Sequence, residues 1–510
     1  MDGYAANTPS PLAPAAQAAY AKNPLPQLPA SAFQVNGGLT FATPQDTSIF
    51  HNTSHLVSPR AGLAWSPTRM HGKTVVRAGF GMFTTPIAIS TLQISGAYST
   101  SAILNQQGFS QATSLTPSNN NYVTPYATLS DPFPGGAIQH PVGSANGLLT
   151  FAGQTVSYFN PEMQNPYSLR WNFGIQHQLT PNTMLEVAYM GNHAVHLPIT
   201  YTQQNILPRQ YLSTLPVRDQ ALISGLTATV PNPFYGLQTA TGTSTTASTA
   251  LLLSRYPQFP AGTGTGSAGV IVQDLNLGSS YYEAFNARVQ KRVSRGLSVI
   301  ANYMRSRMID QTTWLNDTDP RPEHRLSPFD HPNRVSAAAV YELPFGVGRL
   351  ISFHSNLANK LLAGWRLSGT YTFQVGAPIT FVNGSSTTPG DYVYLGGKLN
   401  LNNRLTDGTA FNTSVFDLKS ADQFQYHIRT FSTTFGDVRQ DGINDWNMSL
   451  LKEFRFKERA TFRLQCDAFN VVNHPTFAAP NTQVSNSAFG TITSQANRSR
   501  MLQLSAKLAF

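Results

Sequence analysis

The sequence predicts an all-β fold: an antiparallel transmembrane β-barrel of the outer-membrane type. The chain would supply about eleven or twelve strands, joined by long extracellular loops and short periplasmic turns. Apolar and polar residues alternate with a period of two over many segments of ten or more residues, the length that a tilted membrane strand needs. No stretch of the 510 residues approaches the roughly 18 apolar residues of a membrane helix. A chain of this composition that spans a bilayer must therefore do so with strands.

The strongest alternation is in the last ten residues, Met-Leu-Gln-Leu-Ser-Ala-Lys-Leu-Ala-Phe. Leu502, Leu504, Leu508 and Phe510 lie on one face of an extended chain, and polar residues lie on the other. A terminal strand with lipid on one side and water on the other closes a barrel and leaves no free edge. We interpret these four residues as the signal for barrel assembly.

The same pattern recurs upstream and predicts eleven strands. They cover residues 57–66, 73–83, 167–179, 183–192, 281–293, 297–307, 333–343, 362–376, 444–456, 459–471 and 500–510. A weaker candidate at residues 33–42 would make twelve. Single-chain bacterial barrels normally have an even number of strands, so either this strand is real or further strands precede the chain; the second interpretation is favoured.

The lengths of the connections predict which end of the barrel faces the periplasm. Short connections lie at residues 67–72, 180–182, 294–296 and 457–459, and a longer one, rich in turn-forming residues at its start, spans 344–361. Long connections lie between them, at about 84–166, 194–280, 308–332, 377–443 and 473–498. If Phe510 ends at the periplasm, every short turn is periplasmic and every long loop is extracellular.

Aromatic residues near the strand ends predict a girdle at the membrane surface, where amphipathic rings sit at the level of the headgroups. The predicted girdle residues are Trp65, Trp171, Tyr189, Trp365, Trp446 and Phe454. The alternative is the core of a soluble sandwich. Strand length argues against it, because sandwich strands are typically about 5 to 6 residues long.

Charged residues on the second face of the strands predict a solvated inner wall, on which opposite charges pair across strands. The predicted wall comprises Arg170, Arg288, Arg366, Arg455, Arg463 and Asp467, together with Glu283 and Glu453.

Several other functions lack support. The net charge is +10, but Lys and Arg are scattered without a dense cluster, so we expect no nucleic-acid partner. The single cysteine, Cys466, cannot form an intramolecular disulfide. Histidine pairs in two loops lack a third ligand at metal-site spacing, and no phosphate loop or nucleophile elbow is found. We therefore expect no metal, no cofactor and no enzymatic activity.

Short motifs in a fixed order identify a resemblance over residues 57–510. They are Ser58-Pro-Arg-Ala-Gly-Leu-Ala-Trp65, Thr74-Val-Val-Arg-Ala-Gly-Phe-Gly-Met-Phe83, Asp330-His-Pro-Asn-Arg334, Tyr341-Glu-Leu-Pro-Phe-Gly346, Phe469-Asn-Val-Val-Asn-His-Pro-Thr-Phe477 and Phe489-Gly-Thr-Ile492. Their order resembles the C-terminal part of the barrel of Oar-like TonB-dependent transporters. The resemblance implies an outer-membrane protein that moves a large or scarce solute. Its implied partners are outer-membrane lipid, the barrel assembly machinery and the TonB system.

The chain departs from that family at its start. Residues 1–56 form an Ala- and Pro-rich loop or linker with one possible strand, and no signal peptide, TonB-contacting segment or plug is visible. The sequence is therefore interpreted as the back half of a transporter whose barrel has about 22 strands. Two alternatives stay open: a structural or adhesive surface protein, favoured by the Thr- and Ser-rich loops, and a passive pore.

Overall fold

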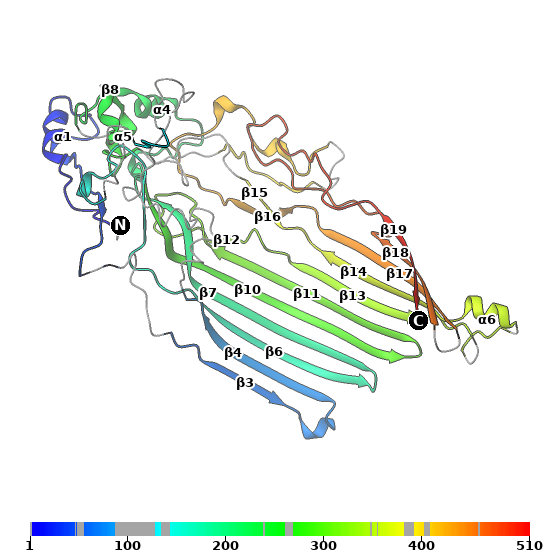
Figure 1. Ribbon diagram of the computed structural model, residues 1–510. Coiled ribbons are helices and arrows are strands. Elements are labelled where there is room, and N and C mark those ends of the chain that lie inside the picture. The colour runs from blue at the N-terminus through cyan, green and yellow to red at the C-terminus, as the bar shows by residue number, and fades with distance from the viewer. Residues whose placement is uncertain are drawn as a thin grey trace.

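The computed structural model describes residues 3–45, 47, 56–86, 128–133, 143–237, 240–260, 269–346, 349–353, 355–381, 392–401, 408–456 and 460–510. One large sheet dominates it (Figure 1). Eleven strands form its continuous path: β3 (Arg60–Trp65), β4 (Thr74–Thr84), β6 (Tyr167–Thr180), β7 (Thr183–Gln203), β10 (Val270–Ser294), β11 (Leu297–Gln311), β13 (Asn333–Glu342), β14 (Trp365–Gln374), β17 (Ile443–Phe456), β18 (Ala460–Phe469) and β19 (Met501–Ala509).

These strands follow one another in the sheet in the order of the sequence, and each pairs antiparallel with the next. Each corresponds to one of the eleven predicted strands, so the predicted antiparallel sheet is confirmed. The twelfth candidate, residues 33–42, is not part of it. Only β2 (Leu39–Thr40) is extended there, and it pairs with β1 (Gly3–Tyr4) outside the large sheet.

The register places most of the apolar residues of the eleven strands on one face. Leu504 lies opposite Cys466, which lies opposite Leu450, and the series continues through Leu367 to Tyr341. We call this the apolar face, and the opposite side the polar face. Leu504 is 80% exposed, as expected of a face that contacts lipid rather than a protein core.

The two ends of the sheet differ (Figure 1). At one end, the turn end, short connections and the C-terminus lie together, because Ala509 is paired with Thr461 beside the predicted 457–459 turn. Residues 457–459 themselves lie outside the described residues. Helix α6 (Asn356–Leu362) belongs to the longer connection at this end.

The other end, the loop end, carries packed loops with two main hydrophobic cores. The first core contains Tyr20, Phe33, Phe234 and Leu253, and it joins α1 (Ala13–Tyr20) to α4 (Gln220–Thr227), α5 (Thr249–Leu253) and the strands β8 (Thr229–Pro231) and β9 (Thr246–Ser248). The second contains Phe381, Tyr392, Phe411, Phe416 and Phe489 beside β15 (Pro378–Thr380) and β16 (Thr434–Arg439). Two short strands, β5 (Val156–Phe159) and β12 (Arg325–Leu326), extend the large sheet here. We call the described residues of these loops the loop cap.

Residues 3–45 belong to this cap, because Tyr20 and Phe33 stack at 4.0 Å and Phe33 packs on Phe234. The composition of this segment predicted a loop or linker, and its helix α1 and its packing were not predicted. Among the described residues, no helix is both long enough and apolar enough to cross a membrane.

Candidate functional site: the polar face of the sheet and the loop cap

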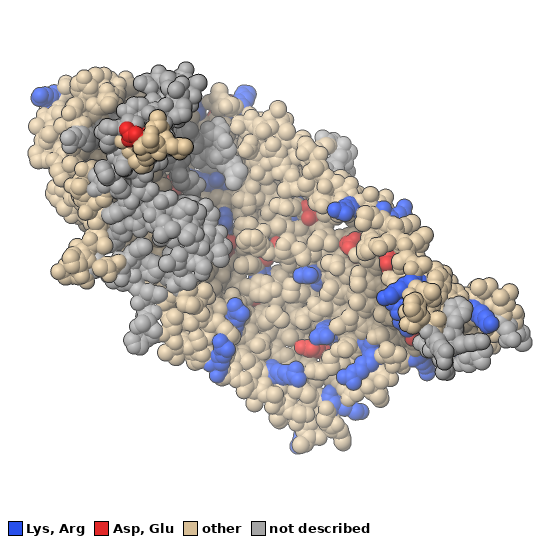
Figure 2. Space-filling model, in the orientation of Figure 1, with Lys and Arg blue, Asp and Glu red and all other residues tan. Residues whose placement is uncertain are grey.

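The polar face is the first candidate site, because the strands place most of their charged and amide side chains on it. Figure 2 shows Lys and Arg spread across the molecule rather than gathered in one cluster. The basic residues that the register places on this face include Arg60, Arg77, Arg170, Arg288, Arg325, Arg334, Arg366, Arg463 and Lys507. The acidic residues there are fewer: Glu186, Asp310, Glu342, Asp445, Glu453 and Asp467.

Six of the predicted wall residues share this face: Arg170, Arg288, Arg366, Glu453, Arg463 and Asp467. Arg463 donates to Glu453 with nitrogen–oxygen distances of 2.6 and 3.0 Å. Arg366 lies 3.5 Å from Glu342, and Asp467 accepts from Gln465 at 2.8 Å. The side chain of Arg455 lies outside the described part of the chain.

The sequence pattern predicted that Glu283 belongs to the inner wall, and this prediction is wrong. The register puts Glu283 on the apolar face, where Arg307 lies directly opposite it. The reason is the strict alternation of β10: Glu283 shares the parity of Tyr281 and Phe285, and both of these side chains are exposed on the apolar face. An acid and a base placed directly opposite each other in an antiparallel pair attract each other.

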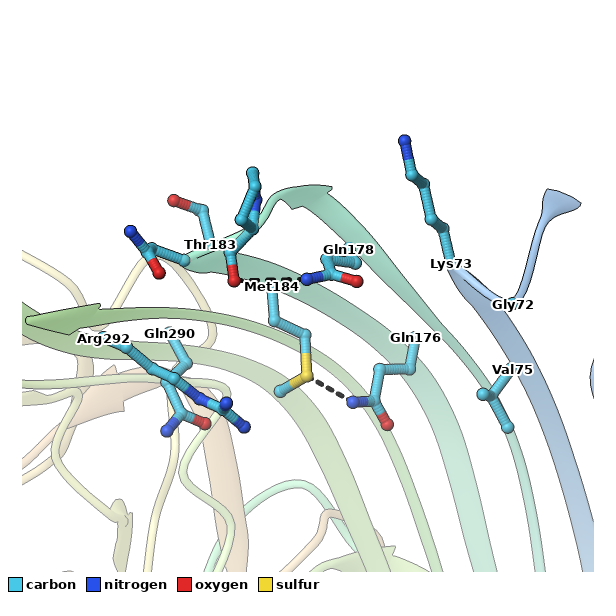
Figure 3. Close-up of a pocket in the computed structure, with 11 residues that line it drawn as sticks. Gly72, Lys73, Val75, Gln176, Gln178, Thr183, Met184, Gln290 and Arg292 are labelled. Carbon is cyan, nitrogen blue, oxygen red and sulfur yellow. Dashed lines mark hydrogen bonds between the residues drawn. The ribbon is translucent and has the colours of Figure 1, made fainter. Parts of the chain in front are cut away.

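A cavity of about 280 Å³ opens on the polar face at the turn end (Figure 3). Its polar lining includes Lys73, Gln176, Gln178, Gln290 and Arg292, which come from the turn before β4 and from strands β6 and β10. Gln176 donates to the sulfur of Met184, and Gln178 donates to the carbonyl of Pro181 at 3.2 Å. Among the described residues, no acidic side chain lines this cavity, so its described lining presents amide groups and positive charge to whatever enters it.

A second cavity, of about 380 Å³, lies further along the same face. Arg77, Arg170, Asn172 and Glu186 line it. The guanidinium of Arg170 lies 4.9 Å from the ring centre of Phe83, a cation–π distance that holds the side chain against the wall. The two cavities share Val75 and Gln176, so they adjoin each other over β4, β6 and β7.

The sequence matches the family model of the outer membrane beta barrel domain over residues 7–503. The chain belongs to this family. The predicted outer-membrane β-barrel fold and outer-membrane localisation are therefore confirmed. No curated protein matches this sequence.

Solved structures similar to this outer-membrane barrel chain include transporters. The outer membrane transporter YddB from Escherichia coli is 9% identical, with a TM-score of 0.38 over 90% of this chain and 41% of that one. The ferric citrate transporter FecA is 8% identical, with a TM-score of 0.37 over 89% and 38%. The siderophore receptor PiuA from Acinetobacter baumannii is 8% identical, with a TM-score of 0.35 over 88% and 35%. The chain spans less than half of the length of these proteins.

The predicted girdle residues of this outer-membrane barrel all lie on the apolar face: Trp65, Trp171, Tyr189, Trp365, Trp446 and Phe454. Trp65, Trp365 and Phe454 lie at or near the turn ends of their strands, and Trp446 lies near the loop end of β17. Trp446 stacks on Tyr371 with 4.1 Å between the ring centres. Trp171 and Tyr189 lie further inside their strands. The girdle role itself stays a prediction.

The loop cap of the barrel contains buried charge pairs that sequence reasoning missed. Arg439 donates to Asp330 at 2.7 Å, and the Asp330 side chain is only 2% exposed. Arg325 donates to Asp310 at 3.0 Å. Glu323 accepts from both the backbone N–H and the hydroxyl of Thr433, at 3.0 and 2.7 Å. The Asp330–Arg334 motif was the available signal, but it gave no hint of Arg439, the partner of Asp330, which lies 109 residues further along the chain.

These contacts join three loops. Asn316 donates to the carbonyl of Arg429 at 3.0 Å, and the Ser213 N–H donates to the carbonyl of Tyr426 at 2.7 Å. Arg209 lies 2.8 Å from Asp319. The loop after β11 thus bridges the loop between β7 and β10 and the loop between β14 and β17. In the part of the chain that the structure describes, no three His, Cys, Asp or Glu side chains gather as a metal site requires.

Proposed function

We propose that this chain forms part of the barrel of an Oar-like TonB-dependent transporter, which moves a large or scarce solute across the outer membrane. The observation that carries the proposal is the two-faced sheet. Eleven consecutive strands expose apolar side chains on one face and a mostly basic, amide-rich surface on the other. Such a sheet suits a wall between lipid and a wet interior. The ordered motifs of residues 57–510 support the transporter subtype, and no enzymatic activity is proposed.

The polar face would contact the plug that fills barrels of this class. Long, charged side chains on this face can form ion pairs and hydrogen bonds with a polar plug surface. They are Arg170, Arg288, Arg366 and Arg463. Arg455 is assigned to the same wall by the sequence pattern alone. The cavity at the turn end, with Lys73 and Arg292, would then receive acidic or carbonyl-rich segments of the plug.

The remaining parts have roles in this proposal too. Residues 57–510 form the barrel domain, and residues 1–56 form part of an extracellular loop, since α1 packs within the loop cap. The barrel assembly machinery would bind the apolar residues of the terminal strand before the sheet closes. These residues are Leu502, Leu504, Leu508 and Phe510.

Deletion of Phe510, or Phe510→Arg, should therefore reduce insertion of the barrel into the outer membrane. The loss of heat-modifiable gel mobility measures this reduction.

A structural or adhesive surface protein is the second candidate. The loop cap favours it, because its two aromatic cores and buried ion pairs fix several long loops as one body. A rigid surface of this kind can bind a partner outside the cell without any transport.

The test is to isolate the native protein from outer membranes with an antibody against residues 408–439, after formaldehyde cross-linking. A transporter should cross-link to TonB and show no constitutive conductance in planar bilayers. A protein that conducts constantly and does not cross-link to TonB would be a passive pore, and the proposal would fail. A protein that does neither would favour the adhesive function.

A further inference from the structure

The connection between β13 and β14 leaves an unusual number of aliphatic side chains uncovered. Five of them are exposed at or beside helix α6: Leu350 (87%), Ile351 (44%), Leu357 (67%), Leu361 (52%) and Leu362 (46%). The helix is well formed, because the Ser355 hydroxyl accepts from the Ala358 N–H at its start. A turn that faced only water would not be expected to concentrate aliphatic side chains in this way.

Two side chains of the apolar face fix the end of this helix. The indole nitrogen of Trp365 donates to the carbonyl of Leu361 at 3.0 Å, and the Lys452 ammonium donates to the carbonyl of Ala363. Trp365 and Lys452 lie directly opposite each other in strands β14 and β17. The helix is therefore attached at the rim of the lipid-facing side of the sheet, at its turn end (Figure 1), and not over the polar face.

The surroundings of Lys452 indicate where this rim lies relative to the membrane surface. Its register position is on the apolar face, between Leu450 and Phe454, yet the residue is only 2% exposed. The ammonium lies 5.0 Å from the ring centre of Phe454 and 5.8 Å from that of Trp365. A lysine whose stem follows apolar surface while its charge meets aromatic rings and a carbonyl is typical of the membrane–water boundary.

We propose that α6 is an interfacial membrane anchor, which lies on the periplasmic leaflet of the outer membrane and inserts into its phospholipid. Leu357, Leu361 and Leu362 would enter the boundary between headgroups and acyl chains, while Lys360 faces the phosphates. The occupant is lipid because Trp365, a residue of the apolar face, binds the carbonyl of Leu361 and so holds the exposed leucines beside that face. The inference depends on the membrane setting of the barrel and not on TonB coupling.

The test places one fluorescent probe at a time on a Cys466→Ala background. The protein is reconstituted in vesicles of phosphatidylethanolamine and phosphatidylglycerol, with and without bromine atoms on the acyl chains. An NBD label on Leu361→Cys should emit at shorter wavelength than in water and should be quenched by brominated lipid. The same label on Leu504→Cys, in the middle of β19, is the positive control. Leu418→Cys, an exposed leucine of the loop cap, is the matched control and should not be quenched.

The outcomes separate this inference from the function proposed above. Quenching at positions 361 and 504 but not at 418 supports the anchor. Quenching at 504 alone overturns the anchor and leaves the barrel and its transport function intact. A probe at 361 that is shielded from water but not quenched reports burial against protein, and it also overturns the anchor. Absence of quenching at both 361 and 504 contradicts the anchor together with the membrane-spanning sheet.

Discussion

Asp330 is the residue whose contacts hold the loop cap to the sheet. One of its carboxylate oxygens accepts from the Met308 N–H at 2.7 Å, and the other accepts from Arg439 at 2.7 Å. Because this carboxylate is buried, Asp330→Ala removes the charged partner of the part-buried Arg439 guanidinium, which keeps only backbone carbonyl acceptors, and leaves the Met308 N–H without its acceptor. We expect a loss of about 3–5 kcal/mol in the stability of the cap, measured as faster proteolysis of residues 308–332.

The control for this change is Asp422→Ala. Asp422 lies 3.8 Å from Lys419, and both side chains are well exposed. An exposed pair of this kind contributes about 0–1 kcal/mol, so the variant should resist protease like the parent protein. Equal protection in both variants would show that the buried pair does not stabilise the cap.

His427 makes the loop cap sensitive to acid. Burial lowers the pKa of its imidazole below the ordinary value of 6.5. Nε2 donates to the carbonyl of Leu215 at 2.9 Å, while Nδ1 is buried without a partner among the described residues. Protonation would therefore place a second buried N–H where no acceptor is found.

The sign of the effect follows from this lowered pKa. Above pH 6.5 the imidazole is neutral in both the packed and the opened loops, and the stability is fully present. As the pH falls below 6.5, the opened state binds the proton more readily, so the packed state loses stability. Hydrogen exchange of residues 211–219 and 424–430 should accelerate at pH 5 relative to pH 8, after correction for intrinsic rates. His427→Gln should abolish this difference, and an unchanged pH dependence in that variant would contradict the assignment.

Substitutions in β19 can show which face of the sheet contacts the lipid. Leu504 lies in the middle of this strand on the apolar face, and Ser505 follows it on the polar face. Leu504→Arg should cost about 2–4 kcal/mol, because a guanidinium near the middle of the bilayer is poorly solvated. Ser505→Arg should change stability much less. Unfolding by guanidinium chloride in vesicles measures both, and equal losses would contradict the assignment of the faces.

The strands could be predicted from the sequence because each one alternates by itself. The segment 333–343 needs no knowledge of its neighbours to be read as a strand, and β13 covers Asn333–Glu342. The segments of β7 and β10 at the loop end of the sheet could not be predicted. Strand β10 starts at Val270, eleven residues before the predicted start, and Val270, Ile271 and Val272 are all buried in the cap. Buried on both sides, they do not alternate.

The candidate site, like the strands, could be predicted from the sequence only in part. Wall residues such as Arg170 and Arg463 could be predicted because strand parity alone decides their face. The contacts of the loop cap depend instead on residues that are distant in sequence, such as Glu323 with Thr433 or Phe381 with Phe489. No local period encodes such pairs, so the sequence predicted loops where the structure has two packed cores.

For the whole molecule, the directions of the strands limit how the sheet can close. Ten successive antiparallel pairings join β3 to β19, so these two edge strands run in the same direction. Closure of β3 directly onto β19 would create a parallel seam in an otherwise antiparallel barrel. An antiparallel barrel requires an odd number of further strands between them, consistent with the even totals of single-chain bacterial barrels.

This geometry predicts different protection at the two edges in two preparations. In the isolated 510-residue chain, refolded in detergent, the amides of β3 and β19 that point away from their single neighbours should exchange rapidly, because nothing pairs with them. If further strands complete the sheet, the same amides should be protected in the protein isolated from outer membranes. Amides in the interior of the sheet, for instance in β13, serve as the control and should be protected in both preparations. Slow exchange at both edges of the isolated chain would mean that the chain closes on itself through a parallel seam, and the requirement for further strands would then be wrong.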